Sequence, residues 1–106
     1  MINSKKSWVI RNSKIQGVGV FLDRDYEANE RIDIGIYFFL GFFPIVTPFG
    51  SKINHQDNAN CYLQYYKHQW HVTTRSPLTK ATEITINYQD CPWYIKGKEK
   101  DYIELK

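Results

Sequence analysis

The chain carries the segment Asn54-His55-Gln56-Asp57-Asn58-Ala59-Asn60 and, further on, the segment Glu83-Ile84-Thr85-Ile86-Asn87-Tyr88. The first is rich in Asn and Asp, whose side chains bond to nearby backbone groups and favour irregular loops. The second alternates apolar and polar residues, which predicts a half-buried strand that ends in an aromatic residue. Each pattern is common by itself. Their order and spacing in one small chain make them the most informative feature of the sequence.

Length and composition predict one compact unit. The chain has 106 residues, of which 42% are hydrophobic, with 3 Trp, 8 Tyr and 6 Phe. Such a supply of large, rigid side chains favours a packed core over disorder. The net charge of +3 is spread along the chain and does not by itself indicate nucleic-acid binding. We expect a single domain over residues 1–106, with a core at about 6–93 and a solvated C-terminal tail at 94–106.

Strand signals dominate the chain. Short runs of β-branched and aromatic residues, each bounded by turn formers, predict strands at 8–10, 19–22, 32–36, 62–66, 70–74 and 83–88. Lys67-His68-Gln69 predicts a hairpin tip between two of them. No segment longer than about ten residues has a clean helical period. The fold class is therefore mainly β.

The run Tyr37-Phe38-Phe39-Leu40-Gly41-Phe42-Phe43-Pro44 fits neither the strand period nor the helix period. We expect it to be a buried connector that plugs the small core. Two functional alternatives stay open, an aromatic-walled channel or a surface that binds a partner, because so large an exposed patch would otherwise be a liability.

Upstream of the two opening segments lies a third motif, Gly17-Val18-Gly19 followed by Val20-Phe21. Together and in this order, the three motifs resemble the SET domain family of S-adenosylmethionine-dependent protein lysine methyltransferases, in the form of a minimal viral or bacterial member. The resemblance runs from about Lys6 to Trp93. It implies a SET-domain, β-clip-like fold of short antiparallel strands with a C-terminal pseudoknot and few short helices or 3-10 turns.

The resemblance also implies roles for particular residues. The cofactor, S-adenosylmethionine, is expected to contact Gly17, Val18, Gly19, Asn54, His55 and Trp93, and Asn60 completes the Asn-His motif. Tyr88 takes the place of the catalytic tyrosine. The expected substrate channel consists of Tyr37, Phe39, Tyr62 and Tyr88.

The chain departs from the family pattern mostly at turns. Ala81-Thr82 stands where the family has Gly-Glu, and Ala28-Asn29-Glu30 stands where it has Lys-Gly-Glu. Asn29 can replace glycine there because asparagine tolerates positive φ. The variable insert that builds half of the family's substrate groove is reduced to residues 35–52.

Methyl transfer to an amine is an in-line displacement, so the protein mainly has to align the reacting groups. A lysine amine has a pKa near 10.4 and must lose its proton to react. An apolar, aromatic channel and a nearby positive charge both lower that pKa. Tyr88 suits such a site because its hydroxyl can orient the amine while its ring forms a wall, without serving as a general base.

The predicted function is methyl transfer from S-adenosylmethionine to a lysine side chain of a protein or peptide. Two other functions remain open: a SET-like module that binds a peptide without catalysis, and a small β-barrel that binds single-stranded nucleic acid. The second would use Tyr65, Tyr66, Trp70 and Trp93 as stacking residues. No metal is expected, because Cys61, His68, His71 and Cys91 match no common zinc spacing.

Cysteine content and apolar runs bear on the location of the protein. Two cysteines are too few for a disulfide framework, and no apolar run is long enough for a signal peptide or a membrane span. We expect an intracellular, cytoplasmic protein, in the host cell if the protein is viral, with no membrane partner. A homodimer through residues 38–43 is left open.

Overall fold

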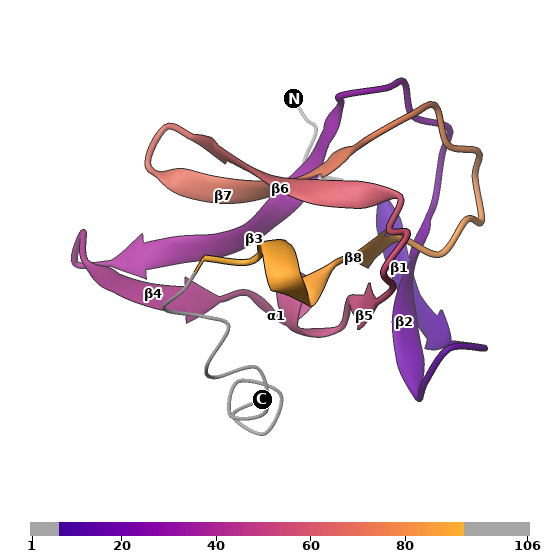
Figure 1. Cartoon of the computed structure of the whole chain (residues 1–106), viewed down its shortest axis with the longest axis horizontal. Coiled ribbons are helices and arrows are strands. Elements are labelled where there is room, and N and C mark those ends of the chain that lie inside the picture. The colour runs from indigo at the N-terminus through magenta and orange to yellow at the C-terminus, as the bar shows by residue number, and fades with distance from the viewer. Residues whose placement is uncertain (1–6, 93–106) are drawn as a thin grey trace.

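The computed structural model describes residues 7–92 and consists mainly of short strands (Figure 1). Strands β1 (Trp8–Asn12) and β2 (Val18–Leu22) form an antiparallel ladder. A four-stranded antiparallel sheet has the order β4-β3-β7-β6, built from β3 (Arg31–Phe39), β4 (Phe43–Val46), β6 (Cys61–Tyr66) and β7 (Gln69–Thr74). The parallel pair β5 (Asn54–His55) and β8 (Thr85–Ile86) completes the strands. The expected mainly β fold is confirmed.

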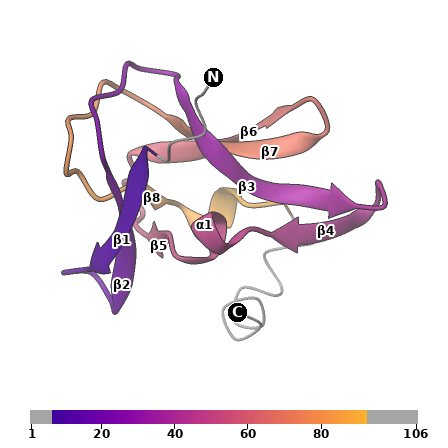
Figure 2. The same ribbon diagram turned by 180° about the vertical axis from the view of Figure 1, so that it is seen from behind.

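The two ends of the molecule differ in the elements they contain. The β1-β2 ladder lies at one end, and the β3-β4 and β6-β7 hairpins extend together towards the other end (Figures 1 and 2). Helix α1 (Pro48–Ser51) and the pair β5-β8 lie between them. The chain therefore places its shortest, most irregular elements at the centre, where segments distant in sequence meet.

Helical structure is short and locally specified. Helix α1 begins after Thr47, whose side chain accepts a hydrogen bond from Gly50 N, and Pro48 occupies its first turn. A 3-10 turn, η1 (Tyr88–Asp90), follows Asn87, whose side chain accepts from Gln89 N. Within residues 7–92, no helix combines the length and the apolar character needed to cross a bilayer.

The segment before β8 joins two separate ladders. Its first part bonds to β2, with Leu22 N donating to Thr82 O at 2.9 Å and Ile84 N donating to Val20 O at 2.9 Å. Its second part is β8, which pairs with β5 in parallel, Asn54 opposite Thr85 and His55 opposite Ile86. The strand expected over 83–88 is thus real but shorter, because Asn87 caps η1 and turns Tyr88 out of the strand.

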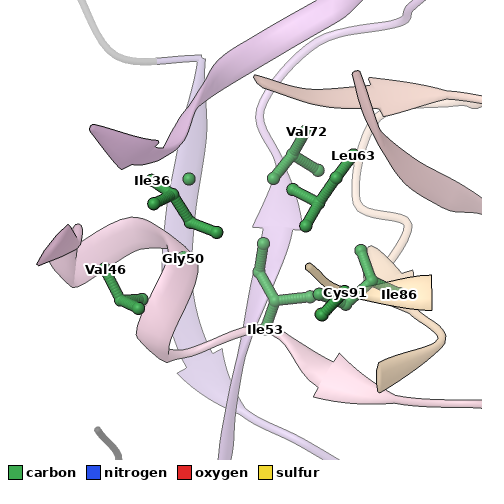
Figure 3. A pocket seen from close by; sticks show the side chains of 9 residues that line it. Ile36, Val46, Gly50, Ile53, Leu63, Val72, Ile86 and Cys91 are labelled. Carbon is green, nitrogen blue, oxygen red and sulfur yellow. The ribbon is translucent and has the colours of Figure 1, made fainter. Parts of the chain in front are cut away.

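The core lies where these elements meet. Its fully buried side chains come from β2, β7 and the segments beside β5 and β8: Val20, Leu22, Ile53, Val72 and Ile84. Gly50 of α1 packs directly on β3, since a Cβ at that position would lie 2.6 Å from Gly35 O. The apolar side chains around this contact leave a cavity of about 20 Å³ (Figure 3). The cavity has room for about one water, but its lining is mostly apolar, so it is expected to stay dry.

The aromatic run at residues 37–44 is not the buried connector that its composition suggested. It forms the end of β3, a turn and the start of β4, with Leu40 at φ 56° and Gly41 at φ 84°. Phe39, Leu40, Phe42 and Phe43 are between 51% and 69% exposed. The expectation was wrong because the left-handed turn folds the run into a hairpin that extends past the core, so its side chains face solvent.

Candidate functional site

The motif residues meet in one cleft. It has a volume of about 320 Å³, which falls in the range of small-molecule sites. The loop between β1 and β2 contributes Ile15 and Gln16, and β2 begins with Val18, which also lines the cleft. Residues 51–55, from the end of α1 to β5, and Tyr88 of η1 complete the lining. Segments that are far apart in sequence therefore form a single concave surface, and they include members of all three motifs.

The side chain of Asn54 holds the β1-β2 loop in place at one side of this cleft. Its Nδ2 lies 3.1 Å from both Gln16 O and Val18 O, 3.0 Å from Ser13 Oγ and 2.9 Å from Glu83 Oε2. Two amide protons are thus shared among four acceptors of the protein, which attaches the β1-β2 loop to β5. The Oδ1 atom of Asn54 takes part in none of these bonds. Asn54 shapes the cleft through its NH₂ group and has only its Oδ1 and backbone groups to offer a ligand.

Glu83 supports the site through its contacts with Ser13 and Asn54, although the sequence analysis predicted for it only the start of a strand. Ser13 Oγ lies 2.9 and 2.8 Å from its two carboxylate oxygens, in addition to the bond from Asn54. A Cβ at position 19 would lie 2.1 Å from Glu83 Oε2. Gly19 therefore makes room for this carboxylate, whereas Gly17 has open space around it and serves the turn at φ 50°. No periodicity in the sequence could have revealed this contact, because it joins residues from separate ladders.

His55 holds the main chain of Tyr88. Its Nδ1 accepts a hydrogen bond from Tyr88 N at 3.0 Å, and its Nε2 lies 3.0 Å from the exposed Asp57 Oδ1. In the neutral ring the proton is therefore on Nε2, where Asp57 accepts it. The rings of His55 and Tyr88 lie 5.0 Å apart between centroids. The second residue of the Asn-His motif thus places the tyrosine at the edge of the cleft.

The side chain of Tyr88 is also fixed in direction. Its hydroxyl donates to Ile53 O at 2.9 Å, and the residue is partly buried. With the proton directed to a backbone carbonyl, any further hydrogen bond to this oxygen is one that the oxygen accepts. This is the chemistry of a group that receives and orients an N–H donor.

Asn60 completes the attachment of the two opening segments. Its Nδ2 donates to Glu83 O at 3.0 Å and its Oδ1 accepts from Thr85 N at 2.9 Å. One amide side chain thus takes the place of a backbone strand partner beside β8. Asn60 does not line the cleft, and its contacts are structural.

Lys52 is a cleft residue that the sequence did not single out. It is the C-terminal cap of α1, with its backbone N–H bonded to Gly50 O and Phe49 O. A cationic side chain in a small-molecule cleft favours a ligand that carries a carboxylate or another anion. The only feature of the sequence that could have pointed to Lys52 as a cleft residue is its position two residues before Asn54.

The residues expected to form the substrate channel do not meet. Tyr37, Tyr62 and Tyr88 line three different clefts, and Phe39 is 53% exposed on the β3-β4 hairpin. Tyr62 instead donates its hydroxyl to Asn29 Oδ1 at 3.1 Å. Trp93, expected at the cofactor, lies outside the described residues. Of the residues that the resemblance implied, Asn54, His55 and Tyr88 therefore lie together in one cleft, whereas the others expected in the substrate channel lie apart from Tyr88.

The rival metal site has little support in the described part of the chain. Burial raises the pKa of the Cys61 thiol to about 12, so it stays protonated and is a poor ligand. His68 lies at the β6-β7 tip, where its ring nitrogens bond to Tyr65 Oη and Gly41 O. Among residues 7–92 no three His, Cys, Asp or Glu side chains are grouped so as to hold a metal ion.

Comparison with known proteins places the fold. No protein-family model and no curated protein matches the chain. A solved Plasmodium falciparum protein, named a "putative histone methyltransferase", superposes with a TM-score of 0.68 over 85% of this chain and 98% of its own, at 23% identity. At that identity the likeness establishes the architecture alone. The chain has a small, mainly β, SET-like fold.

Proposed function

We propose that this protein binds S-adenosylmethionine and transfers its methyl group to the side-chain amine of a lysine in a protein. The observation that carries the proposal is the single cleft in which the β1-β2 loop, Asn54-His55 and Tyr88 converge. A shared fold with a protein named as a histone methyltransferase supports the reaction class.

The cleft residues suit this cofactor. Asn54 Oδ1 is an acceptor, and Lys52 provides a positive charge for the carboxylate of the cofactor's amino-acid end. Apolar side chains of Ile15, Val18 and Ile53 provide surface for the adenine ring. When bound, the cofactor supplies a methyl group on a positively charged sulfur.

Tyr88 would position the amine. Because the hydroxyl donates its own proton to Ile53 O, it would meet the incoming amine as an acceptor of an N–H, which directs the nitrogen lone pair elsewhere, towards the methyl group. Its ring and the neighbouring His55 ring exclude water from one side of the amine. Desolvation lowers the amine's pKa from near 10.4 and so raises the reactive neutral fraction.

The first experiment measures cofactor binding separately from turnover. Calorimetry with S-adenosylmethionine and with its demethylated product should show one site. Methyl incorporation is then followed with core histones and a lysine-containing peptide library as probes. Tyr88→Phe should reduce turnover about 100-fold, as for loss of one transition-state hydrogen bond, with cofactor affinity within about threefold. Tyr66→Phe, on the exposed β6-β7 hairpin, is the matched control and should change neither quantity.

The outcomes separate the remaining alternatives. Absence of cofactor binding at millimolar concentration would end the proposal. Peptide binding with no methyl transfer would instead indicate a SET-like binding module. A salt-dependent shift with short oligonucleotides, without cofactor binding, would indicate the nucleic-acid function, for which Tyr65 and Tyr66 are 50% and 40% exposed on β6.

A further inference from the structure

A second cleft shares no lining residue with the first. It has a volume of about 340 Å³. Trp8 of β1, Asp33 and Tyr37 of β3, Phe49 of α1 and Gln69 of β7 line it. The assigned chemistry at Asn54 and Tyr88 uses none of these side chains, so the cleft needs its own explanation.

Asp33 places a carboxylate in this cleft in a fixed orientation. Its Oδ2 accepts from Trp8 Nε1 at 2.8 Å, and its Oδ1 accepts from Ile34 N at 2.7 Å. The ion pairs found within residues 7–92 involve other carboxylates, those of Glu30, Asp57 and Asp90. A half-buried negative charge is thus held by neutral donors and lies beside a space large enough for a ligand.

Aromatic rings form much of the remaining lining. The Trp8 and Phe49 rings lie 4.8 Å apart between centroids at 40°, and Phe49 is only 3% exposed. Tyr37 is 38% exposed on the same cleft. The negative faces of aromatic rings attract cations, and an adjacent carboxylate adds to that attraction. The lining therefore selects for positive charge.

We propose that this cleft binds an alkylated ammonium group, as carried by a methylated lysine side chain of a partner protein. A bare ammonium has three N–H donors and a strongly held hydration shell. Two of the polar groups here are already engaged, because each Asp33 oxygen accepts one bond and the Thr47 hydroxyl is bonded to Ile34 O and Gly50 N. The other side-chain groups of the lining that can accept a hydrogen bond are the Gln69 amide and the Tyr37 hydroxyl. Methylation removes those donors and spreads the charge over carbon, which suits aromatic faces with one carboxylate.

The test compares three probes of similar shape by calorimetry or amide NMR shifts. They are Nε-trimethyllysine, lysine, and a neutral analogue in which a tert-butyl group replaces the trimethylammonium. We expect trimethyllysine to bind at least tenfold more tightly than either of the others. Equal binding of the neutral analogue would overturn the proposal in favour of a simple apolar slot, and equal binding of lysine, or no binding at all, would also overturn it.

Two variants locate the binding. Asp33→Asn removes the charge while keeping an acceptor for Trp8, and the exposed Tyr37→Ala removes one ring without touching the core. Each should weaken trimethyllysine at least fivefold, whereas Asp23→Asn, on an exposed loop, should not change it. Retained affinity in both variants would place the probe elsewhere. Because the clefts share no residue, this result stands whether or not the first cleft binds S-adenosylmethionine.

Discussion

We call the parallel pair β5-β8, with the segments bonded to it, the crossing. The crossing and the paired hairpins at the far end of the molecule are held by different kinds of contact. At the crossing, Asn54, Asn60 and Glu83 connect three segments through side-chain hydrogen bonds. At the hairpin end, His68 bonds to Gly41 O at 3.1 Å and stacks near Phe38, but large apolar side chains stay exposed. Side-chain hydrogen bonds join the segments beside the apolar core, whereas large apolar side chains are exposed at the hairpin end.

This difference shows where the fold depends most on particular side chains. A short parallel pair of two residues per strand has few backbone bonds, so side chains must supply the rest. The β3-β4 hairpin has a regular ladder and needs no such help. Substitutions at the crossing should therefore lower the free energy of unfolding more than substitutions at the hairpins. At the hairpins, the main effect should be on association.

The largest effect is expected for Asn60→Ala. The change leaves Glu83 O and Thr85 N without their side-chain partners at a partly buried place, which should reduce the free energy of unfolding by about 2–4 kcal/mol. Urea denaturation measures the difference, with the exposed Asn58→Ala as the control expected to stay within about 0.5 kcal/mol. Equal midpoints for the two variants would show that the crossing does not depend on this amide.

A smaller loss is expected for Gly19→Ala. Its Cβ would approach Glu83 Oε2 to 2.1 Å and Asn54 Nδ2 to 3.2 Å, so the carboxylate held by Ser13 must move, at a cost of about 1–3 kcal/mol. Gly17→Ala meets open space and should lose only about 1 kcal/mol, from its left-handed φ. Thermal unfolding ranks the two, and a greater loss at Gly17 would contradict the packing argument.

A gain of about 1 kcal/mol is expected for Ala81→Gly. Ala81 has φ 76°, where a Cβ is strained, and its N–H already bonds to Leu22 O at 2.8 Å. Glycine relieves that strain, although it also gives the unfolded chain more freedom. Ala28→Gly, at a turn residue without positive φ, should be destabilising instead. A loss of stability for both variants would refute the strain at position 81.

The smallest effect on stability is expected at the hairpin end. Phe42→Ser replaces a side chain that is 64% exposed and should change the free energy of unfolding by less than about 0.5 kcal/mol. If residues 38–43 mediate self-association, as an exposed apolar patch favours, native mass measurements should show less dimer for this variant. A dimer that persists at the same concentration would assign the contact to another surface.

The sequence predicted much of the polar framework and little of the aromatic one. The strands expected between residues 8 and 36 and between 62 and 74, the hairpin tip at Lys67-His68 and the positive φ of Asn29 follow from local residue preferences, and the structure has them. Strands β4 and β5 were not predicted. Asn29 has φ 59°, as its type allows. The predictions for the aromatic run and for the channel residues were wrong because the exposure of a side chain depends on which elements cover its face of the sheet. A local sequence pattern does not contain that information.

Local residue patterns were enough to predict most of the longer strands, the turn at Lys67-His68 and the polar motifs at Asn54-His55 and Glu83-Tyr88, but not β4 or β5. The predicted features follow from backbone preferences and side-chain chemistry that act over a few residues. Tertiary structure alone decided that Glu83 lies under Gly19, that Tyr88 faces Ile53 O, and that Tyr37 lies with Trp8 and Asp33 instead. Each of these contacts joins separate ladders, and their relative positions are set only when the core packs.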